Sequence, residues 1–122
     1  LTATCAPGRV AEIAASVAKT GRALVDAPVS GGVAGVRDNS LTVMASAPKP
    51  VFDKVEPILR AFGRNVYHLG EAPGQGAAMK TVNQLLAGIH IAAAAEGLAL
   101  AEREGIDPAL AQAMRRENEG RS

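Results

Sequence analysis

The sequence is poor in aromatic residues and in cysteine, and these shortages exclude several classes of protein. Among its 122 residues there are no Trp, one Tyr and two Phe, and the formal net charge is +1. A nucleic-acid surface needs a basic stripe, usually with stacking aromatics, so we expect no nucleic-acid partner. The single cysteine, Cys5, cannot form an internal disulfide, which is typical of a reducing, cytoplasmic compartment.

Signals for metal binding and for membrane insertion are also scarce. The two histidines, His68 and His90, lie in apolar segments without the spacing of metal ligands, so we expect no metal site. No signal peptide is visible. The longest apolar run, Leu85 to Ala101, is interrupted by His90 and Glu96 and is shorter than the roughly 20 residues that span a membrane. We therefore expect no membrane segment.

The first half of the chain alternates helical and strand patterns. Pro7 and the apolar spacing after it predict a helix that stops at Gly21. A second helical pattern covers residues 50–63, where Pro57 must kink the helix or lie in its first turn. Short strands are predicted at residues 23–25, 40–46 and 65–70. This half is therefore an α/β layer.

The second half of the chain is helical throughout. One helix is predicted from about Gly76 to Glu104, which makes it about 40 Å long. Gly105 ends this helix, and Asp107-Pro108 begins the next one. We therefore expect two domains, residues 1–75 and residues 76–122, with the long helix as the connection. The chain starts at Leu1 and ends in a helical pattern, so we expect it to be a piece of a longer protein.

Polar residues on the apolar long helix are the first candidates for chemistry. Lys80, Asn83 and Gln84 share one helix face because residues three and four apart are neighbours. A lysine beside amides in a partly dry cleft has its charged form disfavoured and can act as a general acid or base. The alternative is a solvated helix start, where all three simply face water.

A loop of small residues is the second candidate. In "DAPVSGG", the backbone amides of Gly31 and Gly32 and the Ser30 hydroxyl can form a concavity that binds an anion. The alternative is a plain turn. No helix is expected directly after this loop, so "SGGVAG" is not interpreted as a dinucleotide-binding fingerprint. Thr4, before the first helix, is a weaker candidate whose default interpretation is a turn residue.

The stretches "DAPVSGGVAG", "LTVMAS" and "GQGAAMKTVNQLLAG", in this order and spacing, resemble the β-hydroxyacid dehydrogenases. That family includes 3-hydroxyisobutyrate dehydrogenase, tartronate semialdehyde reductase and threonate dehydrogenase. The similarity runs from "TATCAP" to "GIDPAL". It implies that the chain is the C-terminal part of a Rossmann-type domain, then the connecting helix and the start of an all-helical domain.

The resemblance also implies residue roles and a cofactor. The family's catalytic lysine falls on Lys80, its substrate-binding Ser-Gly-Gly on Ser30, Gly31 and Gly32, and its amide positions on Asn83 and Gln84. Its cofactor-contacting threonine matches Thr4, although Ala3 replaces the usual serine. The implied reaction transfers hydride between NAD or NADP and a small 3-hydroxy acid or semialdehyde. The full-length enzyme is expected to be a homo-oligomer.

One part of the family pattern is missing from the sequence. The glycine-rich unit that binds the cofactor pyrophosphate would precede Leu1, so we expect this chain alone to be inactive. Two other interpretations stay open. The Ala-rich helix could be a non-catalytic dimerisation element, or the chain could belong to a 6-phosphogluconate-type dehydrogenase, which would need extra cationic residues near Ser30.

Overall fold

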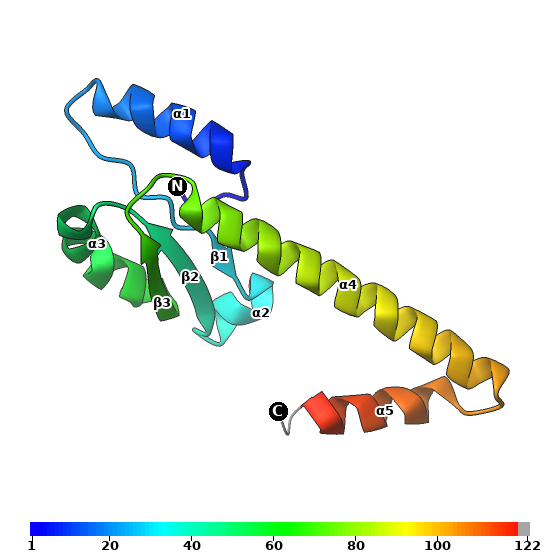
Figure 1. The fold of residues 1–122 in the computed structure, drawn as a ribbon. Helices are drawn as coiled ribbons and strands as arrows, with labels where there is room; N and C mark the ends of the chain where they lie inside the picture. The colour runs from blue at the N-terminus through cyan, green and yellow to red at the C-terminus, as the bar shows by residue number, and fades with distance from the viewer. Residues whose placement is uncertain (120–122) are drawn as a thin grey trace. The chain divides into compact units, whose positions relative to one another are not determined.

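The computed structural model describes residues 1–119 of the chain. Its contacts divide the chain into two compact units, Leu1–Asn83 and Gln84–Ser122. The elements are α1 (Pro7–Ala18), β1 (Val29–Ser30), α2 (Gly32–Arg37), β2 (Leu41–Ser46), α3 (Lys49–Phe62), β3 (Gly63–Gly70), α4 (Gln75–Arg103) and α5 (Pro108–Glu119) (Figure 1). The alternation of helices and strands before a purely helical segment confirms the predicted fold class.

A three-stranded sheet forms the centre of the first unit. The strand order is β1-β2-β3, with β1 antiparallel and β3 parallel to the central β2. The central strand "LTVMAS" is buried at five of its six positions. Such a run has few polar residues because both faces of a central strand are covered. The predicted strands at 40–46 and 65–70 are thus confirmed, although β3 begins two residues earlier, at Gly63.

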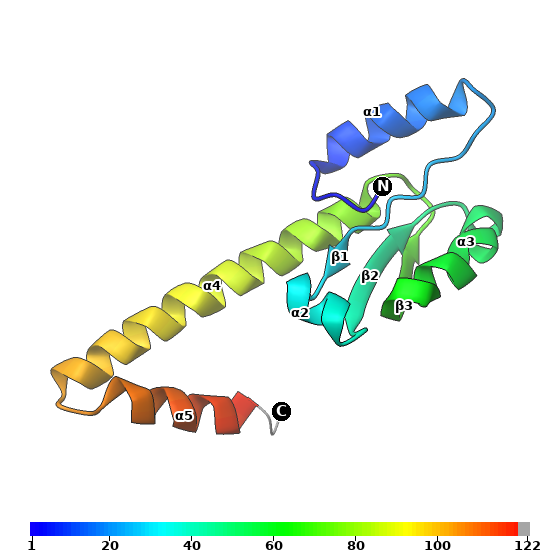
Figure 2. The ribbon, with the colours of Figure 1, turned by 180° about the vertical axis from the view of Figure 1, so that it is seen from behind.

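Helix α3 connects the two parallel strands and packs beside β3 (Figures 1 and 2). Phe52 and Leu59, two turns apart on one face, are buried in the core with small and β-branched residues in and next to the strands, Ala27, Val43, Ala45 and Ala47. Phe52 stacks on His68 with ring centroids 4.4 Å apart. The other contact of His68 is a hydrogen bond of 2.8 Å between Nε2 and the Ala47 carbonyl, so this histidine is structural. The helix continues past Pro57, which lies beyond its first turn.

The predicted strand at Ala23–Val25 is wrong. No strand forms there: the Val25 carbonyl accepts a bond from the Leu1 amino group, and the backbone of Asp26 pairs with Ser46 as an isolated bridge. The apolar run suggested a buried strand, but Ala23 is exposed. A strand needs a neighbouring strand along its length to satisfy its backbone hydrogen-bonding groups. Here Leu1 satisfies the Val25 carbonyl but does not form such a neighbouring strand.

A short helix begins at the second of the two glycines, where none was expected. Helix α2 starts at Gly32, with Gly31 between it and the two-residue strand β1, and lies against β2 (Figure 2). The expectation that no helix follows this loop, on which the rejection of a dinucleotide-binding fingerprint rested, was therefore wrong. The unit nevertheless differs from that fingerprint, since β1 is antiparallel to its neighbour and the nucleotide-binding strand is part of a parallel βαβ unit.

Helix α4 begins against the ends of the strands, and its second residue must be glycine for that reason. A Cβ at Gly76 would clash with the Met44 carbonyl oxygen and would lie 3.0 Å from the Asp26 carbonyl oxygen. Helix start and strand backbone are therefore in direct contact. The predicted boundaries of this helix, Gly76 and Glu104, each differ from the observed ones by one residue.

The second unit shows the expected helix ends. Gly105 has φ of +76°, and the amides of Gly105 and Ile106 bond to the carbonyls of Glu102 and Ala101, which closes α4. The Asp107 carboxylate accepts the Ala109 amide at 2.9 Å and caps α5. Large apolar side chains of this unit are exposed, among them Leu85, Leu86, Ile89, Ile91, Leu100, Leu110 and Met114.

Within the described residues, α4 is long and apolar enough to cross a membrane by length and composition alone. The sequence expectation counted only the apolar run from Leu85 and found it too short. The helix is longer because it also includes the residues around Lys80 and extends to Arg103. A core helix of a soluble protein passes the same test, so this is weak evidence for a membrane span.

We predict that Gly76→Ala destabilises the fold by roughly 1–3 kcal/mol, because the added methyl group overpacks a contact with rigid backbone. Gly8→Ala is a matched control, since Gly8 is likewise the second residue of a helix and has open space around it. Denaturant unfolding of the two variants measures the difference. Equal stabilities would contradict the close packing of α4 on the strands.

Candidate functional site

Lys80 is buried in the part of α4 that belongs to the first unit. The buried residues of this helix are Gly76, Ala77 and Lys80, which share one face because they are three and four residues apart. Lys80 is only 8% exposed. Its Nζ makes no hydrogen bond or ion pair with any residue in the described range 1–119. The solvated alternative is thus wrong for this residue.

Asn83, one turn further along α4, contacts the small-residue segment directly. Its Nδ2 donates a hydrogen bond of 3.1 Å to the Ser30 Oγ, across 53 positions of sequence. A serine hydroxyl that accepts this bond still has its own proton to donate. The Asn83 Oδ1 is likewise left as an acceptor. The pair therefore presents one donor and one acceptor, as a ligand with a carboxylate and a hydroxyl group requires.

The two glycines after Ser30 differ in what surrounds them. Gly31 has φ of +127°, and a Cβ there would lie 3.0 Å from Leu41 Cδ2, so its lack of a side chain serves the backbone and the packing. Gly32 has φ of +57° and nothing within 4 Å of a built Cβ. The space beside Gly32 is therefore open, whereas that beside Gly31 is filled by Leu41.

Two further predicted residues are not joined to this group. Gln84 is exposed and is the first residue of the second unit. Thr4 is exposed in the segment before α1. Its hydroxyl makes no hydrogen bond with any described residue, so it is available to a ligand.

A cavity of about 300 Å³ opens beside the Ser30–Asn83 pair. These two polar residues lie in its wall, and the other lining residues are Thr42, Met44, Tyr67, Leu69 and Met79. A few polar groups on a mostly apolar wall are typical of small-molecule sites, and the volume is at the lower end of their usual range. Lys80 is on the same helix one turn earlier but is not part of this lining.

The sequence interpretation missed Asp26, a buried acid that contacts the start of α4. The Asp26 Oδ2 accepts the Ala77 amide at 2.9 Å and the Ser46 hydroxyl at 3.3 Å, while the Ser46 Oγ accepts the Gly76 amide at 3.1 Å. Asp26 is 1% exposed, and its Oδ1 has no partner within the described residues. Asp26 was not among the residues that the sequence singled out. A carboxylate directly after an apolar run was the available signal.

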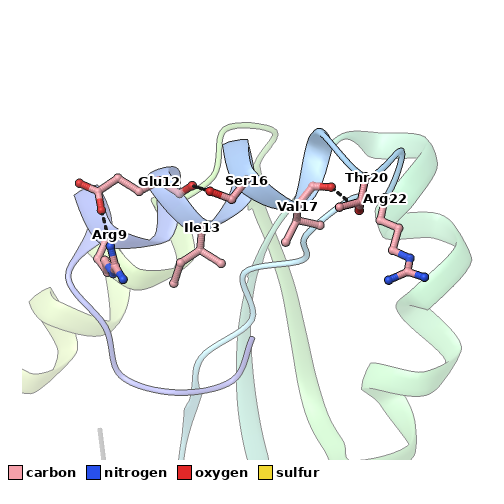
Figure 3. Close-up of a pocket in the computed structure, with 7 residues that line it drawn as sticks. All are labelled: Arg9, Glu12, Ile13, Ser16, Val17, Thr20 and Arg22. Carbon is pink, nitrogen blue, oxygen red and sulfur yellow. Dashed lines mark hydrogen bonds and ion pairs between the residues drawn. The ribbon is translucent and has the colours of Figure 1, made fainter.

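A second cavity, of about 380 Å³, lies along α1 and contains none of the predicted site residues. Figure 3 shows its lining, with the exposed Arg9–Glu12 ion pair at one end and Thr20 and Arg22 at the other. Exposed pairs of this kind contribute little stability. No group of three or more potential metal ligands occurs anywhere in the described residues.

Comparisons with known proteins agree with the resemblance. Residues 1–70 match the family model described as the NAD binding domain of 6-phosphogluconate dehydrogenase. Residues 74–122 match the one described as NAD-binding of NADP-dependent 3-hydroxyisobutyrate dehydrogenase.

Curated relatives and solved structures give the same result. The chain is 46% identical over 87% of its length to L-threonate dehydrogenase of Cupriavidus necator, covering 36% of that enzyme. It is 38% identical over 96% of its length to 3-hydroxyisobutyrate dehydrogenase of Pseudomonas aeruginosa, covering 39% of it. A crystal structure of 3-hydroxyisobutyrate dehydrogenase from Salmonella typhimurium matches 84% of this chain with a TM-score of 0.76 and 45% identity, over 36% of its own length.

The α/β unit, the helix that follows it and the two matched models define an NAD(P)-binding part of a dehydrogenase. The chain belongs to the β-hydroxyacid dehydrogenase family. It spans little more than a third of the length of the curated relatives given above.

We predict that Ser30 and Asn83 are energetically coupled. In a double-mutant cycle of Ser30→Ala and Asn83→Ala, the coupling free energy of unfolding should be about 0.5–1.5 kcal/mol, the usual contribution of one hydrogen bond. Thr81→Ala is the control partner, because the Thr81 hydroxyl bonds to its own helix at Ala77. Coupling no larger than with Thr81 would show that the Ser30–Asn83 bond does not form in solution.

Proposed function

We propose that this chain is part of an enzyme that transfers hydride between NAD(P) and a small 3-hydroxy acid or semialdehyde. The threonate, tartronate semialdehyde and 3-hydroxyisobutyrate classes are the candidate substrates. The observation that carries the proposal is the burial of Lys80 without a partner, one turn before an asparagine already bonded to Ser30. A buried, unpartnered amine is costly unless a ligand or a proton transfer uses it.

The residues take the following roles in this proposal. Ser30 donates a hydrogen bond from its hydroxyl group to the substrate carboxylate, and the backbone amides of Gly31 and Gly32 donate further hydrogen bonds to it. Asn83 orients the reacting hydroxyl group through its free Oδ1. Lys80 takes the hydroxyl proton during oxidation and returns it to the carbonyl oxygen during reduction. The apolar wall of the cavity fits the carbon chain of a small acid. Gln84, whose side chain is exposed, stays the second candidate amide for the substrate.

The residues present fit one end of the cofactor. Thr4, which matches the family's cofactor-contacting threonine, has an exposed, unbonded hydroxyl that could contact the cofactor. When bound, NAD or NADP supplies or accepts the hydride. The pyrophosphate end needs a parallel strand, a glycine-rich turn and a helix, and the described residues contain no such unit with a parallel first strand.

The two-domain boundary remains part of the proposal. Residues 1–75 would end the Rossmann-type domain, and residues 76–122 would form the connecting helix and the start of an all-helical domain. The two family models meet between residues 70 and 74, which supports this division. We propose a cytoplasmic enzyme that is a homo-oligomer at full length, because the apolar side chains exposed on α4 and α5 require a cover.

The alternatives are less well supported. A dimerisation element without chemistry gives no reason to bury Lys80 or to bond Asn83 to Ser30. A 6-phosphogluconate-type enzyme has one point in its favour, the description of the first family model. It would need cations for a sugar phosphate, whereas the cavity beside Ser30 is lined by no lysine or arginine.

We predict that Lys80→Ala in the product of the complete reading frame lowers kcat by at least about 10²-fold, the usual effect of losing a general acid–base group. Lys54→Ala is the control, because Lys54 is an exposed lysine on α3. Steady-state rates with NAD or NADP and each candidate hydroxy acid give the comparison. Near-normal turnover of the Lys80 variant would exclude the proposed role.

We also predict that the 122-residue chain alone binds neither NAD nor NADP at micromolar concentration. Its share of the site lacks the pyrophosphate cradle, and its exposed apolar side chains favour self-association. Titration calorimetry and analytical sedimentation test both points. A monodisperse monomer with micromolar cofactor affinity would show that this chain is sufficient for binding.

A further inference from the structure

Two segments that carry the proposed site meet at one buried carboxylate. Asp26 is four residues before Ser30, and Ala77, whose amide it accepts, is three residues before Lys80. Backbone bonds also join Asp26 to Ser46 in both directions, at 3.1 Å from the Asp26 amide and 2.7 Å from the Ser46 amide. Ala77, which Asp26 holds by its amide, is thus about 4.5 Å of axial rise, less than one helical turn, before Lys80.

The burial of this acid calls for an explanation. Asp26 is 1% exposed and one of its two oxygens is unpartnered within the described residues. Burying a carboxylate that is only partly satisfied opposes folding. The amides at the start of α4 offset this cost, because a helix N-terminus carries partial positive charge and unpaired donors. The interaction thus fixes the helix start to one place on the strands.

Lys80 depends on that placement more than most side chains do. Its Nζ has no hydrogen bond or ion pair within the described residues, so no polar partner holds the amine. Its position follows from where the first turn of α4 lies. Gly76 reinforces this, since its lack of a Cβ lets the turn touch the strand backbone. A displacement of about 1 Å at a catalytic group can cost on the order of 10²-fold in rate.

We propose that Asp26, with Ser46, is a positioning residue that holds Lys80 in register with Ser30 by bonding the first-turn amides of α4. This inference rests on the proposed function, because it takes Lys80 as the proton-transfer group. Asp26 acts through the helix backbone and does not touch the substrate.

The test compares four variants of the product of the complete reading frame. Asp26→Ala removes the acceptor of the Ala77 amide and should lower kcat by about 10-fold or more, with the Kd for the cofactor unchanged. Asp26→Asn keeps an acceptor oxygen and should recover most of that loss. Ser46→Ala, which changes the side-chain volume less than Asp26→Ala does, should lower kcat several-fold. Asp107→Ala is the matched control, because it removes the same kind of cap from α5 and should leave kcat within about twofold.

A second comparison asks whether Asp26 acts through Lys80. In a Lys80→Ala background, Asp26→Ala should cause no further loss of kcat. An equal loss in both backgrounds, or an Asp26→Ala enzyme within twofold of the parent, would overturn the inference. If Asp26→Ala does not fold, the variants Ser46→Ala and Asp26→Asn provide the test. A role based on hydrogen-bond acceptors would be contradicted if Ser46→Ala left kcat unchanged while Asp26→Asn lowered kcat as much as is expected for Asp26→Ala.

Labelling of Lys80 separates this inference from the proposed function. The rate at which an amine-reactive reagent modifies Lys80, measured by mass spectrometry relative to the exposed Lys54, should rise at least severalfold in Asp26→Ala and little in Asp26→Asn. A parent enzyme that turns over no hydroxy acid would refute the proposed function, and the labelling rates would still test the positioning. Unchanged labelling in Asp26→Ala would overturn the positioning by itself.

Discussion

The bond between the Asp26 carboxylate and the Ala77 amide is the constraint on which the first unit depends. It joins the segment that leads into β1 to the first turn of α4, across 51 positions of sequence. The Ser46 hydroxyl extends the contact to the Gly76 amide, and Gly76 permits it by having no side chain. Asp26 and Ser46 thus each satisfy one helix donor that would otherwise be orphaned, and together they set the position of the residues that follow on both segments.

The candidate site formed by Ser30, Asn83 and Lys80 is partly preorganised for a ligand. Asn83 and Ser30 are bonded to each other before any substrate arrives, so their orientation needs little rearrangement. Lys80, by contrast, is buried and unbonded within the described residues. A fixed binding pair beside an unsatisfied amine is an arrangement that a carboxylate with a neighbouring hydroxyl would complete.

Much of this was predictable from local patterns. The helix from Pro7, the strand "LTVMAS" and the long helix ending at Gly105 follow from periodicity and end signals, which act over a few residues. The burial of Lys80 was open, because helical spacing gives a shared face without saying what that face meets. The Ser30–Asn83 bond was also beyond local patterns, since it spans 53 positions.

The predictions that were wrong or incomplete concern features that depend on residues distant in sequence. Ala23–Val25 has a strand's composition, but the pairing that makes a strand depends on distant neighbours, and here only Leu1 bonds to Val25. The helix after Gly31 was missed because two glycines suggest a turn, although a positive φ at Gly31 can also lead into a helix. At Gly31, which stays a predicted substrate-binding residue, the φ of +127° and the close packing against Leu41 are a further reason for glycine that local sequence did not reveal. Asp26 was missed because its partners, Ser46 and Ala77, are distant in sequence.

The most direct measurement of the central claim is a crystal structure of the product of the complete reading frame with cofactor and a hydroxy acid bound. The account predicts that a carboxylate oxygen of the ligand lies within about 3.2 Å of the Ser30 Oγ. It also predicts that the reacting oxygen lies at a similar distance from the Lys80 Nζ, with the Asp26–Ala77 bond intact. A hydroxy acid bound away from Ser30, or a Lys80 amine that reaches the reacting oxygen neither directly nor through one water, would contradict it.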